Sequence, residues 1–308
     1  MPNTSTPHQL NIGELRQAYE RGENIVNILR DKNKDLSTSD IIEIAYDLQA
    51  GSYTQIAEEN PELQRRYAAE IYSLCQEHIR AGDSILDCGA GELTTLSALS
   101  HHLPSEVRLF AFDLSISRIQ AGRRFVSRMM RDDCAKQLTL FAADMANIPL
   151  ATDSIDVVMT IHALEPNHGR ESELLAELLR VTRRKLILFE PSWEMGSDAV
   201  RARMRDHGYV RNLPSHVAAS SAHLVSVRAL PHPLNQLNPT HCYIIDPNKH
   251  KLAAETDCGQ HDFICPKSSA LLEKKSGYWW SSDGGWAYPE IEGVPCLRER
   301  HAILMSHA

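Results

Sequence analysis

Two closely spaced glycines follow a short apolar run in residues 85–91, ILDCGAG. Gly89 and Gly91 let the backbone approach a ligand closely, and a helix expected to begin near Leu93 adds exposed amides and a positive dipole end. The pattern therefore indicates a site for a nucleotide-like ligand. A dinucleotide-binding loop would carry a third glycine at the position that Thr94 occupies here.

Carboxylates follow the next two expected strands. Asp113 ends one of them, where its carboxylate could accept both hydroxyl groups of a ribose. Asp144 takes the same place after the following strand. The structural alternative for both residues is to cap a helix or a turn.

A histidine comes directly after the fourth expected strand. The ordinary pKa of a histidine is near 6.5, so His162 could accept a proton from a hydroxyl or an amine. Glu165 and His168 are alternatives for that role, and a purely structural role for His162 stays open. Glu190, which ends the fifth strand, is expected to cap a helix or form an ion pair.

The elements that must position these side chains alternate in type from Ser84 onward. Short apolar runs separated by helical stretches are typical of a mostly parallel sheet with crossover helices. The predicted strands are 84–88, 107–113, 137–142, 155–161, 185–190, 223–230 and 241–245. The predicted helices among them are 93–102, 115–130, 170–181 and 199–207. Because no helix joins the last two strands, we expect them to pair antiparallel.

The first 80 residues have helical character. A capping box at 37–40 precedes apolar residues at helical spacing, and a second helix has Asn60 at its N-cap and Pro61 at its first position. A polar connection containing Tyr53 is expected between them.

Composition excludes several classes of protein. Of 308 residues, 43% are hydrophobic and 23% charged, as in ordinary globular chains, and the net charge of -8 does not favour a dedicated nucleic-acid binder. No membrane span and no signal peptide are expected, because no long apolar run is present and the start lacks a basic region followed by one. Seven scattered cysteines indicate reduced thiols, so we expect a cytoplasmic protein.

Taken together, these motifs over about residues 40–246 resemble the class I S-adenosylmethionine-dependent methyltransferases. The resemblance is greatest to the small-molecule branch that includes ubiquinone/menaquinone C-methyltransferases. It implies an α/β, Rossmann-like, seven-stranded, mostly parallel sheet with an antiparallel last strand, and S-adenosyl-L-methionine as cofactor. Leu93 departs from the family, since many members have a third glycine there.

The resemblance also implies roles for individual residues. The methionine part of the cofactor would contact the loop around Asp87, Gly89, Ala90 and Gly91, and Asp113 would hold the ribose. Further implied contacts are Leu114 and Met145 on the adenine ring, Asp144 on its amino group, Tyr46 or Tyr53 closing over the cofactor, and His162 at the sulfonium end.

A reactive sulfonium needs shielding from water, so residues 40–60, called the lid segment below, are expected to cover it. We therefore predict three parts: an N-terminal helical lid region (1–80), a cofactor-binding domain (81–247) and a small domain (256–308).

The C-terminal part resembles the small zinc-ribbon-like activator subunit of tRNA, rRNA and release-factor methyltransferases. The resemblance rests on FICP at 263–266 and on YPEIEGVP at 288–295. A structural zinc site wants four Cys or His ligands in close pairs, and Ser268 stands where a second cysteine would be. We expect a small β-rich domain without metal, in which Trp279, Trp280, Trp286 and Tyr288 supply apolar burial instead.

Three functions are compatible with these observations. The first is methyl transfer to an O, N or C nucleophile of a small biosynthetic intermediate. The second is methylation of RNA or a translation factor, against which the fourth strand is not followed by Asn-Pro-Pro-Tyr. The third is an NAD-binding oxidoreductase or a silent nucleotide-binding protein. The first is favoured.

Overall fold

A seven-stranded sheet forms the centre of the molecule. The structure is a computed structural model and describes residues 11–33, 35–248 and 262–307. The strand order is β3-β2-β1-β4-β5-β7-β6; β1 to β5 pair parallel, while β7 pairs antiparallel with both β5 and β6. The strands are β1 (Ser84–Cys88), β2 (Arg108–Asp113), β3 (Leu138–Ala142), β4 (Ile155–Ile161), β5 (Thr182–Pro191), β6 (His223–Ala229) and β7 (Thr240–Asp246). This confirms the predicted fold class and the antiparallel final pair.

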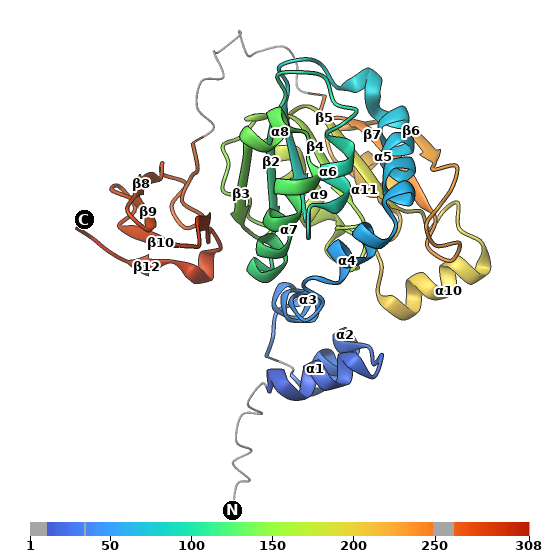
Figure 1. The fold of residues 1–308 in the computed structure, drawn as a ribbon, viewed down its shortest axis with the longest axis horizontal. Coiled ribbons are helices and arrows are strands. Elements are labelled where there is room, and N and C mark those ends of the chain that lie inside the picture. Colours follow the sequence, from blue (N-terminus) through green and yellow to red (C-terminus); the bar gives the residue numbers. More distant parts are fainter. Residues whose placement is uncertain (1–10, 34, 249–261, 308) are drawn as a thin grey trace, which may run out of the picture.

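Helices cover both faces of this sheet (Figure 1). One face packs against α5 (Pro61–Cys75), α6 (Thr94–Leu99) and α7 (Ile116–Met129). The other packs against α9 (Glu171–Val181) and α11 (Leu213–Ala219). Every residue of β1 is buried, as expected of a central parallel strand that is covered on both sides.

The N-terminal helices form a smaller group with its own apolar cluster. They are α1 (Ile12–Glu20), α2 (Ile25–Lys32) and α3 (Thr38–Asp47), followed by α4 (Ser52–Glu59). The Ser37 hydroxyl accepts the amide of Asp40, so the capping box is confirmed. The expected polar connection around Tyr53 is wrong, because that segment is helix α4. The second predicted helix ends earlier than expected, at Cys75, and is followed by a short 3-10 turn, η1 (Gln76–His78).

Three shorter helical elements complete this part of the chain: α8 (Asp132–Lys136), α10 (Asp198–His207) and, near the C-terminus, the 3-10 turn η2 (Glu299–His301).

A small antiparallel sheet follows the predicted linker, as expected for a β-rich C-terminal part. Its strands are β8 (Glu273–Lys275), β9 (Tyr278–Ser281), β10 (Trp286–Ile291), β11 (Val294–Pro295) and β12 (Ile303–Leu304). The chain just after β11 lies along edge strand β3: Ala142 and Cys296 form a parallel bridge, and the Leu297 amide donates to the Ala142 carbonyl at 2.8 Å. The C-terminal part therefore covers the otherwise open edge of the large sheet.

Apolar side chains join the two sheets. The ring of Phe263 contacts Phe141 at a centroid distance of 5.0 Å and Trp279 at 4.9 Å. Cys265 and Tyr288 are buried in the same cluster, with 3.4 Å between the thiol sulfur and the phenol oxygen. Within the residues described, the small sheet thus shares its core with the catalytic domain.

Two membrane and metal criteria can be stated for the described part of the chain. It contains no helix long and apolar enough to cross a membrane. It also contains no group of three or more His, Cys, Asp or Glu arranged to hold a metal ion. Of the residues considered above as a reassembled metal site, Cys265 and Cys296 are buried, whereas Cys258 and His261 lie outside the described residues.

Candidate functional site

The loop after β1 has the backbone that its glycines predict. Gly89 and Gly91 have φ angles of +73° and +56°. A Cβ on Gly89 would lie 2.5 Å from the Ala163 Cβ, and a Cβ on Gly91 would lie 2.5 Å from Nη2 of Arg118. Leu93 itself has φ +59°, a region that favours glycine, which gives a physical reason for a glycine at this position in relatives.

The two predicted carboxylates lie at neighbouring strand ends, and backbone amides orient them. Asp113 accepts the amides of Gly91 and Ser115, each at 2.9 Å. Asp144 accepts the amide of Ala146 at 3.0 Å. Asp113 therefore also serves as the cap that formed its structural alternative, while its buried carboxylate still faces the cavity.

A small cavity of about 70 Å³ opens at these strand ends. Seven of the predicted site residues line it: Tyr46, Gly89, Asp113, Leu114, Asp144, Met145 and His162. The others, Asp87, Ala90, Gly91 and Tyr53, lie beside it without lining it. Burial and the nearby Asp113 charge raise the pKa of Asp87 to about 7.

An arginine that the sequence analysis did not select lies in the cavity wall. Arg118, on α7, lies under the rings of Tyr46 and Tyr53, at 5.3 and 4.8 Å from their centroids. The Glu92 carboxylate, also not selected, accepts the amides of Gly51 and Thr54 at the start of α4. These contacts fasten the lid segment to the glycine loop.

The opposite end of the cavity contains a histidine–carboxylate pair. Nδ1 of His162 lies 2.7 Å from Oε2 of Glu165, and Nε2 lies 2.7 Å from the Thr240 hydroxyl. Asn238 donates to the same Glu165 oxygen at 3.0 Å. His162 has φ +55°, a strained conformation for a residue with a side chain, and such strain is common at functional sites.

Buried charges around this pair shift its titration. Burial by itself lowers the pKa of His162, but the Glu165 carboxylate, and further away Glu190, raise it, so that the net pKa lies above the ordinary value. Burial raises the pKa of Glu190 to about 7. Glu190 accepts the amides of residues 163–165 and so holds the loop that carries His162 and Glu165, instead of capping a helix or pairing with a cation as expected. His168 pairs with Glu171 instead and does not line the cavity.

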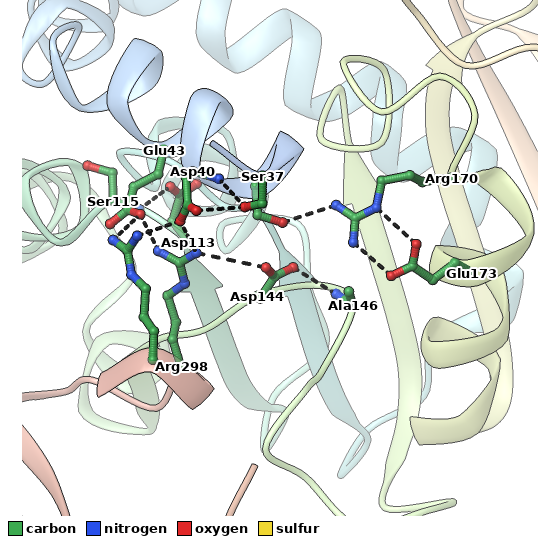
Figure 2. Close-up of polar contacts among 12 residues, drawn as sticks. Ser37, Asp40, Glu43, Asp113, Ser115, Asp144, Ala146, Arg170, Glu173 and Arg298 are labelled. Atoms are coloured by element: carbon green, nitrogen blue, oxygen red, sulfur yellow. Dashed lines mark hydrogen bonds and ion pairs between the residues drawn. The ribbon is translucent and has the colours of Figure 1, made fainter. Parts of the chain in front are cut away.

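A charged cluster closes the adenine-side end. Figure 2 shows Arg298 reaching from the C-terminal segment to Asp40 and Glu43 on α3 and to Asp144. Arg298 is only 5% exposed. Arg300 pairs with the same two carboxylates of α3 from a more exposed position.

Other contacts of the lid segment come from the large domain. Asp47 accepts the Ser115 hydroxyl at 2.6 Å, and Arg170 donates to the Ser39 hydroxyl at 3.0 Å (Figure 2). Three regions distant in sequence therefore meet over the cavity. Arg298 and Thr240 belong to no local motif, so no sequence signal could have selected them.

Comparison with known proteins is consistent with this geometry. Residues 85–185 match the family described as "Methyltransferase domain". A curated relative, an uncharacterized 37.1 kDa protein in transposon TN4556 of Streptomyces fradiae, is 29% identical over 117 residues, which are 37% of this chain. The chain covers 32% of the length of that relative.

Solved structures also share the fold. One is from a complex between the Haloferax volcanii Trm112 methyltransferase activator and a methyltransferase; it has a TM-score of 0.50 at 15% identity and covers 65% of this chain and 95% of its own. Another is magnesium protoporphyrin IX methyltransferase from Synechocystis with bound S-adenosylhomocysteine, with a TM-score of 0.47 at 12% identity, covering 59% and 82%.

The sheet order, the glycine loop and the family match define a class. Residues 85–185 form the methyltransferase domain of a class I S-adenosylmethionine-dependent enzyme, and the cofactor of that class is S-adenosyl-L-methionine.

Proposed function

We propose that the whole chain is a methyltransferase that binds S-adenosyl-L-methionine in this cavity and methylates an O, N or C nucleophile of a small biosynthetic intermediate. The observation that carries the proposal is the glycine loop facing the buried Asp113 carboxylate across one cavity. At Gly89 a side chain would collide with Ala163, so the backbone there stays open to a ligand.

The residues present fit the cofactor part by part. Asp87, Gly89, Ala90 and Gly91 lie where the methionine part would contact the loop. Asp113 would accept the ribose hydroxyls, because a carboxylate that already accepts two amides keeps further lone pairs. The adenine contacts proposed are Leu114, Met145 and, at its amino group, Asp144.

The lid segment would move when the cofactor enters. The cavity volume of about 70 Å³ is well below the roughly 300–1,000 Å³ of typical small-molecule sites. Tyr46 lines the cavity from α3, and Tyr53 contacts Arg118 from α4, so both would close over a bound cofactor. We expect bound cofactor to slow amide exchange across the lid segment.

His162 is the proposed general base. The cofactor supplies a methyl group that is already electrophilic on its sulfonium. Glu165 accepts the Nδ1 proton of His162, which leaves Nε2 as the basic nitrogen. Nε2, now close to the Thr240 hydroxyl, would take the proton from a hydroxyl or amine of the substrate as the nucleophile attacks.

A small-molecule substrate is favoured over RNA by two observations. The net charge of the chain is -8, and the loop after β4 reads IHALEPN where amide- and base-modifying enzymes have Asn-Pro-Pro-Tyr. Incubation with labelled S-adenosylmethionine and separate metabolite and RNA fractions would tell the two apart, since label in the RNA fraction alone contradicts the proposal.

Calorimetry on Asp113→Ala tests the cofactor site. The variant is expected to bind S-adenosylhomocysteine roughly ten- to a hundredfold more weakly, because hydrogen bonds to a charged group are lost. Asp132→Ala, at an exposed position on α8, is the matched control. Unchanged affinity in folded Asp113→Ala, or tight binding of NAD by the wild-type protein, would overturn the assignment.

A further inference from the structure

Arg118 is a buried cation whose donors are not satisfied. The residue is 8% exposed, and its Nε is buried without a hydrogen-bond partner. The nearest carboxylates are Glu92, 3.8 Å from Nε, and Asp113, 3.9 Å from Nη1. Both distances exceed those of hydrogen bonds. A buried guanidinium that makes ion pairs only at this range retains capacity for an acceptor.

The guanidinium lies directly at the glycine loop. Its Nη2 is 2.5 Å from the point where a Cβ on Gly91 would stand, so Gly91 leaves the space that this group uses. Tyr46 and Tyr53 present their rings to it from the lid segment. Arg118 therefore occupies the side of the cavity where the methionine part of the cofactor is proposed to lie.

Charge around the cavity singles out this position for an anion. The lining residues described include three carboxylates, Glu43, Asp113 and Asp144, and one arginine or lysine, Arg118. S-adenosylmethionine carries two positive groups, the sulfonium and the ammonium, and one negative group, the α-carboxylate. The carboxylates suit its hydroxyls and cations, whereas the α-carboxylate finds a complementary charge at Arg118.

We propose that Arg118 binds the α-carboxylate of the cofactor's methionine part and couples its arrival to lid closure. This inference rests on the proposed function, because it assumes that the cofactor occupies the cavity. The planar fork of a guanidinium matches the two oxygens of a carboxylate, and bidentate pairs of this kind are strong. The carboxylate also satisfies the orphaned donor, while the rings of Tyr46 and Tyr53 stay on the guanidinium and hold the lid segment down.

The test compares ligands that differ in one part of the cofactor. S-adenosylhomocysteine has the whole amino acid, decarboxylated S-adenosylmethionine lacks the carboxylate, and 5′-methylthioadenosine lacks the amino acid altogether. Calorimetry measures each ligand against S-adenosylmethionine on wild-type protein, on Arg118→Met and on Arg124→Met. Arg124 lies on the exposed face of the same helix and is the matched control.

We expect Arg118→Met to bind S-adenosylmethionine and S-adenosylhomocysteine about ten- to a hundredfold more weakly. Its affinity for 5′-methylthioadenosine should change less than about threefold, and its preference for S-adenosylmethionine over the decarboxylated form should disappear. Arg124→Met should match wild type throughout.

Two results would overturn the inference. Equal weakening of all ligands in Arg118→Met would make Arg118 a support for Asp113 and Glu92 instead. Wild-type protein that binds S-adenosylmethionine no better than its decarboxylated form would do so without any variant, even if Arg118→Met fails to fold. Failure of wild type to bind any of the adenosyl ligands is a different result, since it contradicts the proposed function itself.

Discussion

The two ends of the cavity are built in different ways. At the sulfonium end, His162, Glu165 and Thr240 stand on or next to strands β4 and β7 of one continuous sheet. At the adenine-side end, Asp144 meets Arg298 from the C-terminal segment and the carboxylates of α3. One end is thus part of a rigid sheet, and the other is assembled from three separate parts of the chain.

This difference suggests a division of tasks. A proton acceptor must keep its position to within a fraction of an ångström, which a sheet provides. A cofactor must enter and leave, so charged contacts that can separate suit the adenine-side end better than an apolar core would. Changes at the assembled end should therefore alter cofactor binding, and changes at the sheet end should alter the proton-transfer step.

The largest effect is expected from removing the apolar anchor of the C-terminal part. Phe263→Ala deletes a buried ring that contacts both Phe141 and Trp279, and such deletions cost about 3–5 kcal/mol. The free energy of unfolding in urea measures the loss. Leu271→Ala in the same segment, where the side chain is 62% exposed, should stay near wild type. Equal, small effects of both substitutions would show that the small sheet does not depend on this shared core.

A smaller effect is expected from Arg298→Met, which breaks the adenine-side cluster itself. Glu43 would lose a buried partner, at a cost of about 2–3 kcal/mol, since Arg300 still neutralises part of the charge. Affinity for S-adenosylhomocysteine should fall, and amide exchange in α3 should become faster.

Two companion variants control this experiment. Arg300→Met removes an arginine that is 48% exposed and should cost at most about 1 kcal/mol. Arg298→Met combined with Glu43→Gln should recover part of the stability, because both members of the buried pair are then uncharged. Loss of the same size in Arg300→Met would contradict the distinction between the buried and the exposed contact.

The same contrast explains what could be predicted from sequence. The seven strands, the glycine loop and the acids Asp113 and Asp144 follow from local patterns, and their placement at adjacent strand ends follows from parallel pairing. Helix α4 was missed because its N-terminus depends on Glu92, a residue about 40 positions away in the chain. Arg298 was missed for the same reason, since its partners lie more than 150 residues away.

A third prediction concerns the sheet end and pH. The Glu165 charge raises the pKa of His162 above its ordinary value, so activity that needs neutral His162 should fall as pH drops through that raised pKa. Removing this charge with Glu165→Gln lowers the pKa of His162, and the acidic limb of kcat/KM should move to lower pH. The maximal rate should drop about tenfold, because the Nδ1 proton is held less firmly.

Stability should respond with a defined sign. A histidine whose pKa is raised on folding contributes stability that is fully present below the unfolded value and is lost as pH rises through the folded one. Glu173→Gln, in an exposed pair with Arg170, is the control and should leave the pH profile unchanged. A profile that does not move in Glu165→Gln would remove His162 as the base.

The smallest expected effect is that of salt, and it separates the two ends without any mutation. Raising sodium chloride from 0.05 to 0.5 M shortens the Debye length from about 14 to about 4 Å and weakens exposed ion pairs such as those of Arg300. Amide exchange in α3 should become about two- to threefold faster, in keeping with the small free energies of exposed pairs. Exchange in β4 and β10 should stay constant, since hydrogen-bonded strands and apolar packing hold them. Exchange that speeds up equally in α3 and β4 would mean that salt acts on the whole fold, and the adenine-side end would then not be the more easily opened one.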